Sequence, residues 1–508
     1  MNVLNRKLLR NLWQLRGQVL AIAIVVASGV AVLVMSLSTL SSLQETAATY
    51  YERYRFADVF ASLTRAPEQL SERIAGIPGV QYAETRISKL ATLDIEGFEE
   101  PVIGQLVSIP ERGESVLNRL ALLSGRLVLP DHPDEAVLSE PFAEAHGLTP
   151  GDRLHAIING NRRTLTVVGI ALSPEYVYAI GPGALMPDNR RFGVLWMGRE
   201  ALAAAYDLDG AFNDLTLALQ RDAQPEAVIQ QLDQLLSRYG GTGAIARADQ
   251  LSNWFLMSEI DQLGTLARIL PTVFLVVAAF LTNMVLARII ATERSEIGLM
   301  KAFGFRHLEI GWYYARMVMA ITVVGIVIGW VVGAWFGQVS TELYAEFYRF
   351  PLLIFSPPPS TFAIGALVSL GAALAGTLGS MRRAANLPPA EAMRPPAPPL
   401  YRRTGLSAST VAAWLDQPTR IILRQIVRWP GRALLTSAGI GLSVGVLVMS
   451  LQWIDSINHI VQVYFYDTQR QDMMVGLVEP QSATAIYEFA HLPGVLMVEP
   501  MRIVSAYL

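Results

Sequence analysis

The sequence predicts an α-helical transmembrane protein with five spans and a large extracytoplasmic α/β domain. Three observations predict this fold class. Five runs of mainly apolar residues are each about 20 residues or longer, which is enough to cross roughly 30 Å of hydrocarbon. Basic residues gather beside alternate ends of these runs. One interval between runs, residues 41–265, is long enough to form a globular module with its own core.

The membrane topology follows from the Arg and Lys residues, which favour the cytoplasmic side. They cluster before the first run, between the second and third runs, and between the fourth and fifth runs. The N-terminus is therefore expected inside. The predicted spans are residues 17–40, 269–291, 314–337, 361–381 and 432–453. They leave 41–265, 338–360 and 454–508 outside and 292–313 and 382–431 inside.

An internal repeat indicates two related units. Leu33–Leu37 recurs as Leu447–Leu451, and the flanking Tyr50 and Asp58 recur in the same register as Tyr464 and Asp472. The register shifts by one residue at the Pro-Gly-Val that follows each copy. Apolar sequence could match over five residues by chance, but the polar flanks in one register indicate a duplication. The recurrence also argues against a cleaved signal peptide, whose apolar core is normally about 7–15 residues.

Each copy begins with a basic amphipathic segment, residues 1–16 and 418–431. Apolar side chains recur there at helical spacing, with Arg and Lys on the other faces: Leu4, Leu8, Leu12 and Leu15, then Ile422, Ile426 and Trp429. Such a helix can lie in the headgroup layer, with its bases near anionic lipid and its apolar stripe in the acyl boundary. The alternative is a plain cytoplasmic extension of the membrane helix.

The external interval has mixed α and β character. One β-α-β unit consists of a strand at Asp58–Leu63, a short helix over Pro67–Gly76 and a returning strand over Val80–Leu93. Residues 212–246 form a second unit, with a helix that begins at Pro225. Between them, a strand at Ala136–Leu138 precedes a helical turn at Pro141–His146, and Asn159-Gly160 predicts a hairpin. Residues 96–209 therefore read as a β-rich insert, with a single continuous domain as the alternative.

Composition excludes several kinds of chemistry. The net charge is −3, and no basic patch with aromatic residues predicts nucleic acid as a partner. The chain has no cysteine and six scattered histidines, so neither a catalytic thiolate nor a metal site is expected. No phosphate-binding loop or nucleophile elbow is present. No catalytic, cofactor-binding or metal-binding residue is therefore predicted, and this chain should not hydrolyse ATP alone.

The predicted spans carry no Asp, Glu, Lys or Arg at their centres, and Asn283 is the strongly polar residue well inside one of them. Because ionisable groups inside a bilayer usually mark ion pathways, this disfavours a secondary transporter. The third span instead carries a stripe of small residues at four-residue spacing, which predicts close helix packing: Gly325, Gly329, Gly333 and Gly337.

The turn between the second and third spans, residues 292–313, is too charged to lie in lipid. Ile297, Met300, Lys301 and Gly304 are spaced as one helical face, and Gly298 and Gly304 would allow close backbone approach. A short helix joined to two spans can transmit a push from a cytoplasmic partner. The alternative is an ordinary polar connector.

The residues of this turn resemble the coupling-helix signature of FtsX-like ABC transporter permeases, the group of the macrolide-exporter and lipoprotein-release permeases. The matching pattern is Glu293-Arg-x-Glu296-Ile-Gly298-x-x-Lys301-Ala-x-Gly304, and a closing segment from Leu387 to Pro395 follows the fourth span. The resemblance implies that Glu293, Glu296, Ile297, Gly298, Lys301 and Gly304 dock on a separate cytoplasmic ABC ATPase. It also implies a periplasmic core with a porter-like part and an inserted lobe.

By the same resemblance, the chain is the permease subunit of an exporter or extraction machine in a bacterial inner membrane, with membrane lipid and a periplasmic adaptor as further candidate partners. The alternative function is a transmembrane transmitter that regulates an envelope enzyme, as in FtsX itself. The repeat resembles the duplicated subfamily with two units in one chain. Because the second copy has one span and residues 454–508, we expect either a longer polypeptide or a second one.

Overall fold

The computed structural model describes residues 3–98, 100, 102–184, 186–389, 393, 416–428, 430–468, 470–477 and 481–501. The chain forms two units, Met1–Leu400 and Tyr401–Leu508, and each is described by itself. Most of the predicted cytoplasmic linker lies outside the described residues, as do Trp429 and parts of the closing segment after Pro389.

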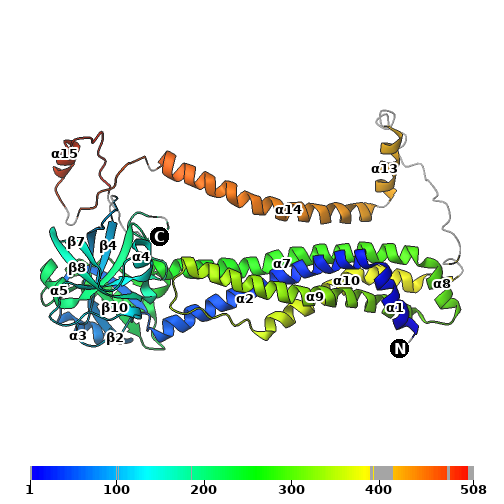
Figure 1. Ribbon diagram of the computed structural model, residues 1–508, viewed down its shortest axis with the longest axis horizontal. Helices are drawn as coiled ribbons and strands as arrows, with labels where there is room; N and C mark the ends of the chain where they lie inside the picture. Colours follow the sequence, from blue (N-terminus) through cyan, green and yellow to red (C-terminus); the bar gives the residue numbers. More distant parts are fainter. Residues whose placement is uncertain are drawn as a thin grey trace. The chain divides into compact units, whose positions relative to one another are not determined.

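The first unit is built on a bundle of four long helices that ends in an α/β domain (Figure 1). Each helix is long and apolar enough to cross a membrane, and together they contain the first four predicted spans. They are α2 (Arg16–Arg53), α7 (Leu251–Thr292), α9 (His307–Phe347) and α10 (Pro359–Asn386). At about 1.5 Å per residue, α2, α7 and α9 are roughly twice as long as the hydrocarbon is thick, so they continue beyond it toward the domain.

The glycine stripe of α9 lies against α2. A Cβ added at Gly329 would come within 2.6 Å of the Val30 Cβ and 2.8 Å of the Ala27 carbonyl oxygen. A Cβ at Gly333 would similarly come within 2.8 Å of the Ala31 carbonyl oxygen, whereas at Gly337 its nearest neighbour would be the Ser38 Cβ at 3.3 Å. The two backbones therefore touch where glycine leaves room, which provides dispersion contacts in a solvent as apolar as the side chains.

The domain contains a four-stranded antiparallel sheet in the order β11-β1-β10-β2. Helices α3 (Leu70–Ala75) and α6 (Pro225–Leu236) follow β1 and β10 in the chain and bury Ile74 and Leu232 in a shared core with Leu215. The predicted β-α-β elements of both ends are found here. The strands are β1 (Val59–Pro67), β2 (Val80–Arg86), β10 (Ala211–Leu219) and β11 (Ala244–Ala246).

A second, seven-stranded sheet has the order β5-β8-β6-β9-β4-β3-β7, and β7 also pairs with β8, which closes six of the strands into a ring. The predicted hairpin at Asn159-Gly160 joins β7 to β8, and both residues have positive φ, 48° and 78°, as a type I′ turn requires. The strands are β3 (Ser88–Asp94), β4 (Val102–Ile109), β5 (Ala121–Gly125), β6 (Glu135–Ser139), β7 (Arg153–Ile158), β8 (Asn161–Leu172) and β9 (Phe192–Gly198). The short helices α4 (Glu140–His146) and α5 (Arg199–Tyr206) complete this part.

The expected single returning strand over Val80–Leu93 is wrong in one respect. The chain breaks at the fully buried Ile87, so that β2 belongs to the first sheet and β3 to the second. Alternation of apolar and polar residues cannot reveal such a break, because both strands are half-buried in the same way. The β-rich part therefore begins at Ser88 and not at residue 96.

The second unit contains α13 (Gln417–Arg428), α14 (Pro430–Val461), a π-helical segment over Gln462–Thr468 and α15 (Ala485–Ala490). The fifth predicted span lies within α14. A short helix followed by a long apolar helix is also the order of α1 (Val3–Gln14) and α2 in the first unit. Among the residues that the structure describes, five helices are able to span a membrane, and together with the sheets of the domain they confirm the predicted fold class.

The glycine contacts predict the effect of Gly329→Ala. The added methyl group must push α2 and α9 apart, which should destabilise the bundle by about 1–3 kcal/mol. Thermal unfolding of the detergent-solubilised full chain measures this. Gly371→Ala in α10 is the matched control, because nothing lies within 4 Å of its added Cβ. Equal melting temperatures for the two variants would contradict the packing described.

Candidate functional site

A short helix, α8 (Arg294–Ala302), forms the turn between α7 and α9 at the end of the bundle opposite the domain (Figure 1). It ends in a Schellman motif, in which the Phe305 amide donates to the Met300 carbonyl at 3.2 Å and the Gly304 amide to the Lys301 carbonyl at 3.0 Å. Gly304 has a φ of +92°, a left-handed conformation that favours glycine. It therefore lies beyond the helix and does not share a helical face with Ile297, contrary to the spacing argument.

The inner face of α8 is part of the bundle core. Ile297 is fully buried and Met300 nearly so, and both pack in one cluster with Ile310 and Tyr314 of α9. Gly298 is buried on the same side. These three residues are thus occupied by contacts within the chain.

Glu293, at the start of α8, binds the N-terminal helix α1 to the turn. Its carboxylate accepts hydrogen bonds from the Asn11 amide at 2.6 Å and from the Tyr314 hydroxyl at 3.0 Å. The Lys7 ammonium lies 3.7 Å from Glu293 and forms a closer ion pair with Glu296. Asn11 is buried, so this polar contact holds α1, α8 and α9 at one point.

Lys301 binds the other end of α8 to α10. Its ammonium donates to the Ala385 carbonyl oxygen at 2.7 Å and to the Leu387 carbonyl oxygen, at the carboxyl end of α10. A lysine at this position satisfies carbonyls that a helix end leaves without intrahelical partners. Partial burial lowers the pKa of Lys301. Glu293, Glu296 and Lys301 therefore each contact another part of the chain.

The outer face of α8 was not identified by the sequence reasoning. Leu299 is 49% exposed and Phe303 is 76% exposed, and Leu308 at the start of α9 is 85% exposed. These large apolar side chains stand in a segment too charged to enter hydrocarbon. Their spacing, with Leu299 and Phe303 four residues apart and out of phase with Ile297 and Met300, is the signal that could have revealed them.

At the other end of the bundle, a buried ion cluster joins the two sheets of the domain. The Arg86 guanidinium donates to both carboxylate oxygens of Glu175, at 2.6 and 3.0 Å, and to Asp214 at 2.8 Å. The Asn118 amide also donates to Glu175 at 2.8 Å. Desolvation raises the pKa of Asp214, and the nearby Arg86 opposes this. One buried arginine thus neutralises one of two carboxylates and fixes where β2 and β10 meet the segment after β8.

The same segment, Ser173–Tyr178, connects the domain to the long helices. The Gln250 side chain, at the start of α7, donates to the Glu175 carbonyl at 2.9 Å, and the Tyr178 amide donates to the Ser252 hydroxyl at 2.8 Å. The Arg349 amide, just after α9, donates to the Val177 carbonyl at 3.0 Å. We call residues 173–178 the joint, because both sheets, α7 and the end of α9 meet there.

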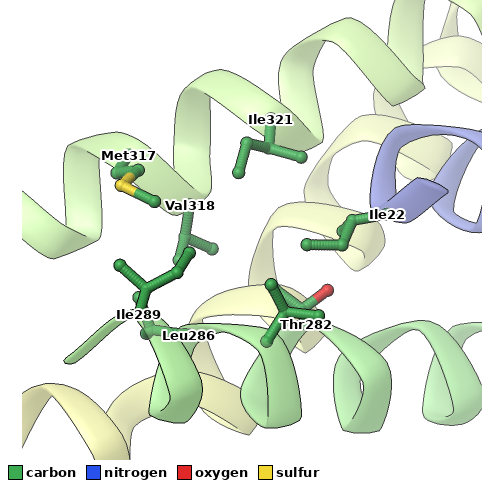
Figure 2. A pocket seen from close by; sticks show the side chains of 8 residues that line it. Ile22, Thr282, Leu286, Ile289, Met317, Val318 and Ile321 are labelled. Atoms are coloured by element: carbon green, nitrogen blue, oxygen red, sulfur yellow. The ribbon is translucent and has the colours of Figure 1, made fainter. Parts of the chain in front are cut away.

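A cavity of about 10 Å³ lies between α2, α7 and α9, and Figure 2 shows the side chains around it. The hydroxyl of Thr282 already donates to the Ala278 carbonyl at 2.7 Å. A space of this size with an apolar lining is at the limit for one water molecule, and it is no transport path. It is lined by Ile22, Thr282, Val285, Leu286, Ile289, Met317, Val318 and Ile321.

Two family models match the chain. A MacB-like periplasmic core domain matches residues 18–235, and the C-terminal part of an FtsX-like permease matches residues 268–389. No curated protein gives a significant match. Among solved structures, the extracellular domain of the noncanonical ABC-type transporter YknZ from Gram-positive bacteria is 13% identical, with a TM-score of 0.26, and covers 37% of this chain and 98% of its own. The periplasmic region of MacB from Actinobacillus actinomycetemcomitans is also 13% identical, with a TM-score of 0.25, and covers 42% and 98%.

These matches and the fold define a multi-pass membrane permease with a MacB-like core domain. The chain is an FtsX/MacB-like ABC transporter permease, which the turn and the core domain already suggested from sequence. Permeases of this family work with a cytoplasmic ABC ATPase. The comparisons carry no information on the substrate.

The Glu293 contacts predict a local effect of Glu293→Ala. Loss of the carboxylate leaves the Asn11 amide without this acceptor inside the protein, at a cost of about 1–3 kcal/mol. Hydrogen exchange of the α1 amides should therefore become faster, while the sheets of the domain are unaffected. Glu296→Ala is the control, because that side chain is 55% exposed and its ion pair contributes little. Equal exchange in the two variants would exclude Glu293 as the anchor of α1.

The ion cluster predicts that Arg86→Met is far more damaging than Asp214→Asn. Removal of the guanidinium leaves two carboxylates buried without a counter-charge, which should cost about 3–5 kcal/mol, whereas Asp214→Asn keeps a hydrogen-bond acceptor and removes the excess charge. Chemical unfolding of the full chain and limited proteolysis at residues 173–178 measure the difference. A larger effect of Asp214→Asn would show that the charge balance has been misjudged.

Proposed function

We propose that this chain is a subunit that converts ATP hydrolysis by a separate cytoplasmic ATPase into motion of its α/β domain, for export or extraction of a substrate. In this proposal the N-terminus and α8 lie in the cytoplasm of a bacterial cell, and the domain lies in the periplasm. ATP would be bound by the partner alone. A periplasmic adaptor is a candidate second partner.

The observation that carries the proposal is the two-sided construction of α8. Its outer side presents Leu299 and Phe303 to solvent, and its inner side packs in the bundle core. An apolar side chain exposed beside charged residues is a typical anchor for a protein partner. A partner that binds this outer side can displace α8 only together with the helices that hold it.

The signature residues then have a transmitting role. Glu293 holds α1 and α9, and Lys301 holds α10, so a force on α8 reaches these three helices. Gly304 ends the helix where α9 must turn back. In this assignment Glu293, Ile297, Gly298 and Lys301 position the docking surface, while Leu299 and Phe303 contact the ATPase.

The force would travel along α7 and α9, each a single helix from the turn to the domain. The close packing of the glycine stripe makes α2 move with α9. At the far end, the joint is hydrogen-bonded to the start of α7 and to the Arg349 amide just after α9. A sliding of one helix against the other would therefore tilt residues 173–178 and, with them, the contact between the two sheets.

A transmitter that regulates an envelope enzyme is the second candidate. The same lever serves both functions. The protein that copurifies from the periplasm separates them, because an adaptor indicates export and a cell-wall hydrolase indicates regulation.

The docking surface predicts that Leu299→Ser combined with Phe303→Ser weakens ATPase binding at least tenfold and leaves the fold intact, since both side chains are exposed. The measurement is binding of the co-expressed ABC ATPase to the purified full chain, together with the permease-dependent ATP hydrolysis. Met186→Ser, an equally exposed apolar residue of the domain, is the control. Unchanged ATPase binding by the double variant would remove the outer face of α8 from the mechanism.

A further inference from the structure

The N-terminal helix α1 has two faces of different chemistry. Lys7 and Asn11 point to α8, and the apolar side chains Leu8, Leu12 and Leu15 pack against the core of the bundle. The expectation that this leucine stripe enters the acyl boundary is therefore wrong for these three residues, because the bundle itself covers them. The side chain of Leu4 lies outside the described part.

The opposite face is exposed, basic and aromatic. Leu9 is 56% exposed and Trp13 is 74% exposed, and Arg6 and Arg10 lie on the same side at helical spacing. The Arg16 guanidinium lies 5.9 Å from the centre of the Trp13 ring. No Asp or Glu occurs in the chain before Glu45, so nothing on α1 balances these charges.

Helix α9 extends this surface. Arg316 donates to the Asn5 side chain of α1 at 3.1 Å, and its guanidinium lies 6.0 Å from the centre of the exposed Trp312 ring. One arginine–tryptophan pair thus lies at the end of α1, where the chain runs into α2, and a second lies on α9, which contacts α1 through Asn5. Tryptophan rings settle at the headgroup level, and arginine binds phosphate through its planar fork of donors.

The internal repeat supplies an independent observation. Arg6, Leu9 and Arg10 of the exposed face recur in the same register as Arg420, Leu423 and Arg424, whereas Lys7 and Asn11 of the inner face correspond to Ile421 and Gln425. The two copies therefore share these three outward residues, although the outward Trp13 and Arg16 correspond to Val427 and Pro430, and they differ in the residues that bind α8. Both segments directly precede a helix that is long and apolar enough to span a membrane. What the two segments have in common is therefore their place next to the bilayer surface.

We infer that the outward face of α1, formed by Arg6, Leu9, Arg10, Trp13 and Arg16 with Trp312 and Arg316 of α9, is a binding surface for anionic phospholipid headgroups. This surface lies beside the first membrane helix, because α1 continues into α2 after a break at Leu15. On the inner face of α1, the ion pair between Lys7 and Glu293 connects this surface to α8. Through this ion pair, ATPase docking at α8 would depend on anionic lipid. This dependence rests on the proposed function, whereas lipid binding itself does not.

The absence of cysteine in the sequence allows a direct test with a single label. An environment-sensitive fluorophore on Leu9→Cys is followed in the full chain, reconstituted without any ATPase in nanodiscs of phosphatidylcholine or of phosphatidylcholine with phosphatidylglycerol. We expect a shift of the emission toward that of a buried label when phosphatidylglycerol is present, and a loss of this shift at high salt. Leu90→Cys, which is similarly exposed on β3 of the domain, should give the same emission in both discs.

The charges are then tested in the labelled chain. The first triple variant combines Arg6→Gln, Arg10→Gln and Arg16→Gln. It should raise about tenfold the phosphatidylglycerol fraction needed for half of the emission shift, or abolish the shift, because each basic group contributes to binding at an anionic surface. The control triple variant Arg73→Gln, Arg221→Gln and Arg238→Gln changes exposed arginines of the domain and should leave the shift unchanged.

Three results would overturn the inference. The first is identical emission of the label at residue 9 in both kinds of nanodisc, and the second is an equal loss of the emission shift in the two triple variants. The third is loss of ATPase binding in the first triple variant without any effect on lipid binding, which would assign this face to a protein partner. A lipid-dependent shift combined with a failure of ATPase binding at α8 would sustain the lipid surface and refute the proposed function.

Discussion

The structure depends on one contact, the approach of the α2 and α9 backbones along the glycine stripe. In lipid, helices gain nothing from leaving the solvent, so association rests on dispersion between surfaces that fit. At Gly325, Gly329 and Gly333 the neighbouring carbonyl oxygen would lie only 2.8 Å from an added Cβ. Such a fit has one register, and a slide of α9 on α2 by a few ångströms would replace contacts by clashes. The two helices therefore behave as one rod, which leaves relative motion to α7 and α10.

Polar contacts are placed where this rod ends. Glu293 and Lys301 join α8 to α1, α9 and α10, and Arg86 joins the two sheets through Glu175. Buried charges rarely increase stability over an apolar core, but their geometry is exacting, because a displaced partner leaves a charge without compensation. Because they lie at both ends of the long helices, they restrict the angles and distances between neighbouring helices and strands more narrowly than apolar packing does.

The sequence was sufficient for the features that are local. Apolar length gave the spans, Asn159-Gly160 gave the hairpin, and Pro225 gave the start of α6. The helix expected to begin at Pro67 is wrong in its start, because Pro67 ends β1 and α3 begins at Leu70. Features set by distant contacts were not accessible. The division of residues 80–93 between two sheets depends on partners more than a hundred positions away, such as Asp214 for Arg86. The periodicity of α8 and α1 showed two faces but could not tell which one the bundle would cover, since both faces of each helix carry large apolar residues.

The N-terminal helices show why that ambiguity matters. In α1 the leucine face was the natural candidate for lipid, yet Leu8 and Leu12 pack on the bundle and the arginines face outward. An arginine with its long apolar stem can lie along hydrocarbon and keep its charge among phosphates, whereas Lys7 reaches Glu293 and Glu296. The second copy has Arg420 and Arg424 in place of Arg6 and Arg10, but it has Ile421 and Gln425 in place of Lys7 and Asn11, and Val427 and Pro430 in place of Trp13 and Arg16. An isoleucine cannot form an ion pair, so Ile421 cannot repeat the contacts that Lys7 makes with Glu293 and Glu296. The two segments thus share two outward arginines and differ in the residues that bind a neighbouring helix in the first unit.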